Sequence, residues 1–252
     1  MPPITFHMVA ATGVAERIGA SHLQGSEGPY LLGATTPDIR VITRGDRRDT
    51  HFFDLDDHEV QDSVARFFQA HAELADAAAV GDDTRSFVCG YLTHLVLDEI
   101  YITRIYRPYF LKHDAIGGRV RANVMDRLLQ FGLDREFGDE PAVVDNLLRA
   151  LAFSVESIEC GFIDHDTLER WRQVTADIAA QNMDWNRARQ MISRHLERAG
   201  ISGPGELEQF LDSLPDLENE TIAHVTDAEI SGFVERSAEA AALTVTRYLG
   251  CG

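Results

Sequence analysis

The chain has 252 residues and 44% of them are hydrophobic, so it can bury a sizeable core and has the composition of an ordinary globular protein. Its 23 Lys and Arg residues are outnumbered by 41 Asp and Glu residues, which gives a net charge of −18. A negative field of this size repels phosphate backbones and anionic membranes, and so argues against a general nucleic-acid-binding protein. It leaves room for a local cationic pocket or for a metal site.

The cysteines and the N-terminal residues indicate in which cellular compartment the protein is expected. The three cysteines are an odd number and widely spaced, so they predict neither a disulfide framework nor a pair of metal-binding thiolates. The N-terminal segment lacks a basic region followed by a long apolar core, so no secretory signal is expected. No stretch approaches the roughly 18 uncharged apolar residues of a membrane-spanning helix. We therefore expect a cytoplasmic protein.

The first predicted helix covers residues 6–20, where apolar residues recur at spacings of three and four on the face that carries His7. The longest irregular stretch follows, over residues 21–56. Loops of that length inside a compact domain tend to be functional. Within it, residues 39–43 (IRVIT) form the only short strand candidate.

Two helices are predicted in the middle of the chain. One covers residues 56–80, with Asp56 and Asp57 as candidate N-caps and with an apolar stripe that contains Val60 and Phe67. The other runs from about 84 to 107 and is ended by Pro108, because proline cannot continue a regular helix.

Further helices are predicted over residues 118–133, 141–158, 164–181, 184–200, 205–214 and 227–249, each beginning near Asp, Pro or Gly. Alternating strand patterns are nearly absent from the whole sequence. The sequence therefore predicts an all-α protein, with a single multi-helix domain over residues 1–252.

The helix "GYLTHLVLDEIY" (residues 90–101) places His94 and Asp98 one turn apart in an otherwise apolar segment. Residues i and i+4 lie on the same helix face, so the imidazole and the carboxylate converge. A divalent metal accepts both groups, and zinc binds nitrogen and oxygen ligands at about 2.0–2.2 Å. The alternative is a structural hydrogen bond between the two side chains inside a helix bundle.

Three other segments favour the metal. "LLGATTPDIR" presents Asp38 from a turn, "RRDTHFFD" supplies His51, and the first helix offers His7 on its apolar side. Taken in order with the H-x-x-x-D pair, these motifs resemble the zinc-dependent phospholipase C family, which shares an all-helical fold with the zinc nucleases that cut single strands. The resemblance covers about residues 1–110.

The resemblance implies a ligand set and a cofactor. Asp38, His51, His94 and Asp98 would bind one zinc ion, and Asp98 would bridge to a second ion that His7 helps to hold. One or two ions are expected, with iron or manganese as alternatives to zinc. Asp38 would also orient or deprotonate the attacking water, which makes it the candidate catalytic residue.

One departure from the family pattern introduces a further candidate. Members with three metals carry a histidine six residues after the H-x-x-x-D aspartate, where this chain has Arg104. A third metal of that kind is therefore not expected. The Arg104 guanidinium could instead bind a phosphate or carboxylate of the substrate, or simply form a surface ion pair.

The remaining candidates carry weaker signals. Glu220 and His224 form another i,i+4 pair, for which a solvated helix face is the alternative to a metal site. Asp54, His22 and His113 are further possible ligands.

Two functions are compatible with these motifs. The first is a metal-dependent hydrolase that uses metal-activated water on a phosphoric ester, with a small phosphodiester, a phosphomonoester or a lipid headgroup as substrate. Long nucleic acids are disfavoured by the net charge. The second is a non-catalytic helical protein in which a structural metal supports a binding or regulatory module.

Overall fold

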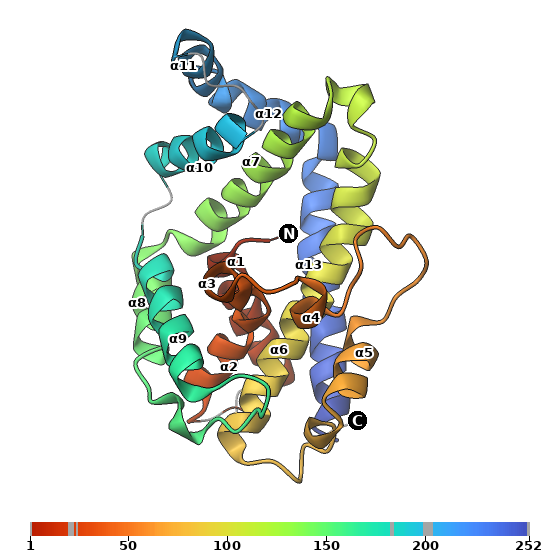
Figure 1. Cartoon of the computed structure of the whole chain (residues 1–252), viewed down its shortest axis with the longest axis vertical. Helices are drawn as coiled ribbons and strands as arrows, with labels where there is room; N and C mark the ends of the chain where they lie inside the picture. The colour runs from red at the N-terminus through yellow and green to blue at the C-terminus, as the bar shows by residue number, and fades with distance from the viewer. Residues whose placement is uncertain (1, 20–22, 24, 182–183, 199–203, 251–252) are drawn as a thin grey trace.

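The computed structural model describes residues 2–19, 23, 25–181, 184–198 and 204–250, and these are all-helical, with no strand among them (Figure 1). The α-helices are α1 Ile4–Ile18, α2 Glu27–Gly33, α3 Arg40–Thr43, α4 Arg48–His51, α5 Ser63–Ala70, α6 Asp82–Tyr101, α7 Arg119–Gly138, α8 Pro141–Ala150, α9 His165–Ala179, α10 Trp185–Arg198, α11 Pro204–Asp212, α12 Leu214–Val225 and α13 Asp227–Tyr248. Short 3-10 turns cover η2 Thr36–Ile39, η3 Ala72–Leu74, η5 His113–Ile116 and η6 Val155–Ser157, and a π-helical segment covers η4 Ile102–Phe110.

The central element is α6, which packs against α2, α13 and α1. In Figure 1, α6 and α13 run side by side, while α10, α11 and α12 gather at the end of the molecule opposite the C-terminus. The buried side chains form large apolar clusters in which α6 takes part on several sides. The predicted all-α single domain is thus confirmed. None of the described helices is both long and apolar enough to cross a membrane.

Two glycines let α2 and α6 approach each other closely. A Cβ atom on Gly33 would lie 2.0 Å from the carbonyl oxygen of Phe87, and one on Gly90 would lie 1.9 Å from the carbonyl oxygen of Tyr30. Such distances exclude any side chain, so this crossing requires glycine at both positions. The contact places the end of α2 directly against the helix turn that carries His94.

The predicted strand at residues 39–43 is wrong, because these residues are helical in η2 and α3. Much of the predicted irregular stretch 21–56 likewise consists of short helices, including α2 and α4. A helix of one turn shows no 3.6-residue repeat, so periodicity could not reveal these elements.

The predicted helix at 56–80 is shorter at both ends, because α5 covers only Ser63–Ala70. Asp62, not Asp56 or Asp57, is its N-cap, and it accepts a hydrogen bond of 2.8 Å from the backbone N–H of Ala65. Val60 is fully exposed in the preceding loop, whereas Phe67 is buried as predicted. Asp57 is used locally in that loop, where its carboxylate accepts from the N–H of Glu59.

Pro108 does not end the helix that begins with α6. The chain continues as a π-helical segment through Phe110, and the N–H of Leu111 donates to the carbonyl of Tyr106 at 3.1 Å, five residues back. The wider π-helical turn accommodates a residue that has no N–H to donate.

The C-terminal half follows the prediction with two differences. α7, α9, α10, α11 and α13 cover the predicted segments, but the helix predicted at 141–158 ends as α8 at Ala150. α12 was not predicted as a helix in its own right; Pro215 lies in its first turn, where a missing N–H has no cost.

Candidate metal centre

Five side chains from four separate elements converge on one buried point. His7 comes from α1, Asp38 from η2, His51 from the last position of α4, and His94 and Asp98 from consecutive turns of α6. The structure therefore brings together all five residues that the motifs indicate. Two overlapping groups have their ligand atoms within 4.8 Å of one another: His7, His94 and Asp98, and Asp38, His51 and His94.

Three of the four distances between histidine nitrogens and carboxylate oxygens at this point suit a tetrahedral ion, and the fourth is longer. Ligand atoms at 2.0–2.2 Å from a tetrahedral zinc lie about 3.3–3.6 Å apart. His51 Nε2 lies 3.4 Å from Asp98 Oδ2 and 3.5 Å from Asp38 Oδ1. His7 Nε2 lies 3.5 Å from Asp98 Oδ1, and His94 Nε2 lies 3.9 Å from Asp98 Oδ2.

Several polar atoms at this point are buried without a hydrogen-bond partner. They are both ring nitrogens of His7, the Nε2 atoms of His51 and His94, and Oδ1 of Asp98. A buried polar atom without a partner costs about 1–3 kcal/mol, so a cluster of such atoms is suited to binding a ligand. Their donor chemistry, imidazole nitrogen with carboxylate oxygen, fits zinc and also iron or manganese.

Hydrogen bonds fix the tautomers of His94 and His51. His94 Nδ1 lies 2.8 Å from the carbonyl oxygen of Ala34, which can only accept, so Nδ1 carries the proton and Nε2 keeps its lone pair. His51 Nδ1 lies 2.9 Å from Thr50 Oγ1, whose own hydroxyl donates to the carbonyl of Arg47. Both histidines thus present Nε2 to the centre.

The turn that carries His51 is tied to α6 by a second bond. The hydroxyl of Tyr91 donates to the carbonyl of Thr50 at 2.6 Å, and Tyr91 is itself buried. One helix therefore supplies two ligands and also positions a third.

His94 belongs to both groups of possible ligands. Its ring stacks on that of His7, with the centroids 3.7 Å apart and the planes 10° apart, and it meets the ring of His51 edge-on. Only one nitrogen of His94 has a lone pair available, and one lone pair binds one ion. His94 therefore completes one of the two groups at a time.

Electrostatics keep both carboxylates ionised. Burial by itself would raise the pKa of Asp98, but the adjacent His7 and His51 and the Arg47 guanidinium outweigh burial and hold the pKa of Asp98 well below its usual range. Burial likewise opposes ionisation of Asp38, but the adjacent His51 outweighs burial, so the pKa of Asp38 is lowered. Two carboxylates in their charged form are ready to bind a cation.

His94 is held neutral. Burial is the main cause, with the neighbouring His7 adding to it, and together they lower the pKa of His94 to about 3. A neutral imidazole is the form that binds a metal.

Arg47 is a member of the centre that the motifs did not indicate. Its Nη2 donates to Asp98 Oδ2 at 2.8 Å and its Nη1 donates to the carbonyl of Phe53 at 3.2 Å. Arg47 is only 9% exposed. The neighbouring Arg48 pairs with Asp46 at the surface, and nothing in the sequence distinguishes the two arginines.

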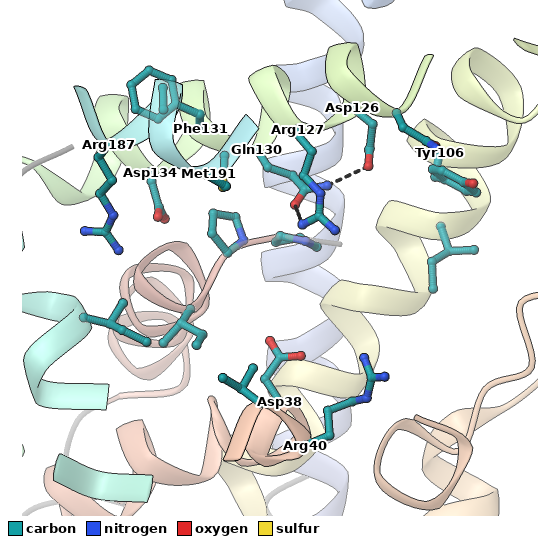
Figure 2. Close-up of a pocket in the computed structure, with 18 of the residues that line it drawn as sticks. Asp38, Arg40, Tyr106, Asp126, Arg127, Gln130, Phe131, Asp134, Arg187 and Met191 are labelled. Atoms are coloured by element: carbon teal, nitrogen blue, oxygen red, sulfur yellow. Dashed lines mark hydrogen bonds between the residues drawn. The ribbon is translucent and has the colours of Figure 1, made fainter. Parts of the chain in front are cut away.

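A pocket of about 560 Å³ opens beside the centre, and Asp38 is the one predicted ligand in its lining (Figure 2). The side chain of Asp38 is 15% exposed, whereas those of His51 and Asp98 are 1% and 4% exposed. Asp38 is therefore the candidate ligand that connects the buried centre to the pocket and to solvent.

The other candidate residues lie elsewhere. Arg104 is exposed on η4 and does not line this pocket, so its position gives no support to a role in substrate binding. Asp54 accepts from the N–H of Asp56. His113 contacts Asp114 at the surface, and His22 falls outside the residues that the structure describes.

The pair on α12 is engaged away from the centre. Glu220 pairs with Arg121, and His224 Nε2 donates to the carbonyl of Tyr109 at 2.9 Å. Neither residue belongs to a cluster of metal-ligating groups within the described part of the chain.

Comparison of the chain with protein-family profiles, characterised proteins and solved structures found no match. The resemblance to the zinc-dependent phospholipase C family therefore rests on the motif residues of the sequence alone.

Proposed function

We propose that the protein is a metal-dependent hydrolase of phosphoric esters, with its metal held by His51, His94, Asp38 and Asp98. A divalent ion held by these residues would supply Lewis acidity towards a phosphoryl group and towards water at neutral pH. His7 would assist a second ion through Asp98. Zinc is the first choice for these ligands, and iron or manganese are alternatives.

The observation that carries the proposal is the position of Asp38. It is both a member of the buried ligand cluster and part of the lining of the 560 Å³ pocket. A catalytic metal site keeps one side open to substrate, whereas a structural site is closed by protein ligands. The ionised Asp38 is also placed to orient a water molecule and to accept its proton.

The alternative is a structural metal in a non-catalytic binding or regulatory module. The burial of the histidines favours it, since His7, His51 and His94 are at most 1% exposed. In that case protein side chains would occupy every coordination position of the metal, and the pocket would have no role at the metal.

The test combines metal analysis with a substrate panel. The wild-type protein, purified without chelator and incubated with zinc, manganese or iron, should retain at least one ion per chain. It should then hydrolyse an aryl phosphodiester or phosphomonoester, and chelator should abolish the activity. His94→Ala should lose both metal and activity.

Asp38→Asn separates the two functions. If the site is catalytic, this variant should lose far more activity than metal, because Asn keeps an oxygen ligand but cannot accept a proton. Arg170→Gln, an exposed residue of α9 outside the pocket, is the control for handling and charge. Metal-loaded wild type that cleaves no ester in a broad panel would favour the structural alternative.

A further inference from the structure

Three arginines line the pocket beside the candidate metal centre, and none of them pairs with a carboxylate of the described residues. Arg40 follows Asp38 closely in the chain, Arg127 lies on α7 and Arg187 lies on α10. Figure 2 shows Arg127 and Arg187 reaching in from the helices on one side of the pocket and Arg40 from the side of Asp38. Among the described residues, no carboxylate lies within salt-bridge distance of these three guanidinium groups, although the sequence has 41 acidic residues.

The side-chain hydrogen bonds that the structure gives these arginines go to neutral groups, and two of the three are long. Arg127 Nη1 lies 3.4 Å from Gln130 Oε1, and Arg187 Nη1 lies 3.2 Å from the carbonyl of Gln181. Arg40 Nε lies 3.5 Å from the carbonyl of Gly45. Each guanidinium has five N–H donors, so most of its donors remain available to a ligand.

The carboxylates that face the same pocket are already engaged. Asp126 accepts from the Tyr101 hydroxyl and from Gln130 Nε2, each at 2.7 Å. Asp134 accepts from the N–H of Phe6 at 2.8 Å, and burial raises its pKa to about 7, so its negative charge is reduced near neutrality. The pocket thus combines three guanidinium groups with three carboxylates, of which Asp38 belongs to the candidate metal centre and the other two are held by hydrogen bonds.

We propose that this pocket binds a substrate with two anionic groups, one phosphoryl group beside Asp38 and Arg40 and a second phosphate or carboxylate held by Arg127 and Arg187. The proposal rests on the proposed hydrolase function for the role of the first group. The second group is bound by arginine alone, in the bidentate manner that guanidinium offers to phosphate and carboxylate.

The rest of the lining indicates what connects the two groups. Between the charged residues lie apolar side chains, and Val41, Leu55 and Met191 are among the most exposed large apolar residues that the structure describes. A volume of about 560 Å³ is within the usual range for small-molecule sites. A hydrocarbon or other weakly polar spacer therefore fits better than a densely hydroxylated one.

The test uses alkane-α,ω-diol bisphosphates with spacers of different length, each compared with the alkyl monophosphate of the same chain length. Affinities are measured by calorimetry on the zinc-loaded wild-type protein and on Arg127→Gln, Arg187→Gln and Arg170→Gln. Arg170 is exposed on α9 and outside the pocket, so it reports the effect of removing one positive charge.

At the best spacer length, the bisphosphate should bind at least tenfold more tightly than the monophosphate. Arg127→Gln and Arg187→Gln should each reduce that preference to threefold or less, while the affinity for the monophosphate and the bound zinc stay as in wild type. Arg170→Gln should keep the full preference. Because Arg127 is exposed and Arg187 only half-buried, these variants should fold, which melting curves check.

Equal affinity for bisphosphates and monophosphates at every spacer length would overturn the proposal, and so would a preference that survives in both pocket variants. Failure of the hydrolase function is distinguishable. If the protein prefers bisphosphates but hydrolyses no ester, the two-anion site stands and the hydrolase function is wrong. If it hydrolyses monoesters without any preference for a second anion, the hydrolase function stands and the two-anion site is wrong.

Discussion

Arg47 Nη2 donates a 2.8 Å hydrogen bond to Oδ2 of Asp98, and both side chains are almost completely buried. Asp98 is also the carboxylate that a metal would share with His51 and His94. A buried carboxylate needs a compensating positive charge. In the metal-free protein, Arg47 supplies it.

Replacing Arg47 with Met should therefore destabilise the metal-free protein by about 3–5 kcal/mol, the usual cost of breaking a buried ion pair. The loss should be clearly smaller in the zinc-saturated protein, because the ion then compensates Asp98. By linkage, the variant should bind zinc more tightly than wild type. Urea unfolding with chelator and with zinc measures both effects.

Arg48→Met is the matched control for that experiment. Arg48 is the next residue, its side chain is 65% exposed, and it pairs with Asp46 at the surface. Its removal should change stability by at most about 1 kcal/mol in either state. An equal loss for Arg47→Met with and without zinc would contradict the compensating role.

Metal should also stabilise the fold as a whole. Zinc should raise the melting temperature of wild type, because it satisfies buried atoms that otherwise have no partner. His94→Ala should remove most of that increase, since His94 belongs to both ligand groups. Scanning calorimetry with zinc or chelator tests this, and a zinc effect that persists undiminished in His94→Ala would place the ion elsewhere.

Asp134 should make the metal-free protein less stable as the pH rises. Burial raises its pKa to about 7 in the folded state from the ordinary value of 3.8, so folding favours the protonated form. The contribution of Asp134 to the free energy of unfolding is fully present below about pH 4 and is lost as the pH rises towards and through 7. The contribution has the opposite sign to that of a salt-bridged carboxylate.

Asp134→Asn removes this dependence and keeps an oxygen to accept from the N–H of Phe6. The variant should match wild type near pH 4 and exceed it at pH 8 by about 2–4 kcal/mol, given about 1.4 kcal/mol per unit of pKa shift. Chemical unfolding at the two pH values, in chelator, provides the comparison. A variant that is no more stable at pH 8 would show that the carboxyl group ionises freely in the fold.

Gly90→Ala should damage both the fold and the metal centre. The new methyl group would overlap the carbonyl of Tyr30, so α2 and α6 must separate, at a cost of about 1–3 kcal/mol or more. Separation would weaken the bond from His94 to Ala34 and lower zinc affinity. Gly13→Ala should instead stabilise by about 0.5–1 kcal/mol, because that helical glycine has open space around its Cβ position. Unfolding and zinc titration of both variants separate steric from helix-propensity effects.

The long helices could be predicted from the sequence because their apolar residues repeat over several turns, as in α7 and α13. The short helices α3 and α4 could not, since a single turn has no measurable repeat. The π-helical segment was missed for a different reason. Proline normally ends an α-helix, in which each N–H donates to the carbonyl four residues earlier. No feature of the local sequence predicts the wider π-helical turn around Pro108.

That the five candidate ligands lie together could be predicted because their motifs, taken in order, resemble those of a known metal-binding family. Arg47 was not, because its sequence neighbour Arg48 has the same chemistry and only burial distinguishes them. Arg127 and Arg187 lie far along the chain on helices without a motif, and no spacing rule connects them to the centre. Their proximity to Asp38 is a result of tertiary packing alone.

The crossing of α2 and α6 corresponds to a spacing pattern of glycines and candidate ligands in the sequence. Gly33 precedes Asp38 by five residues, and Gly90 precedes His94 by four, with Asp98 four further on. The backbones of α2 and α6 touch at these two glycines. The number of residues between each glycine and the candidate ligand that follows it therefore fixes how far that ligand lies from the helix crossing. The paired pattern G-x4-D and G-x3-H-x3-D thus encodes an interhelical distance. It offers a way to find other chains that build this centre where their overall sequences have diverged too far to align.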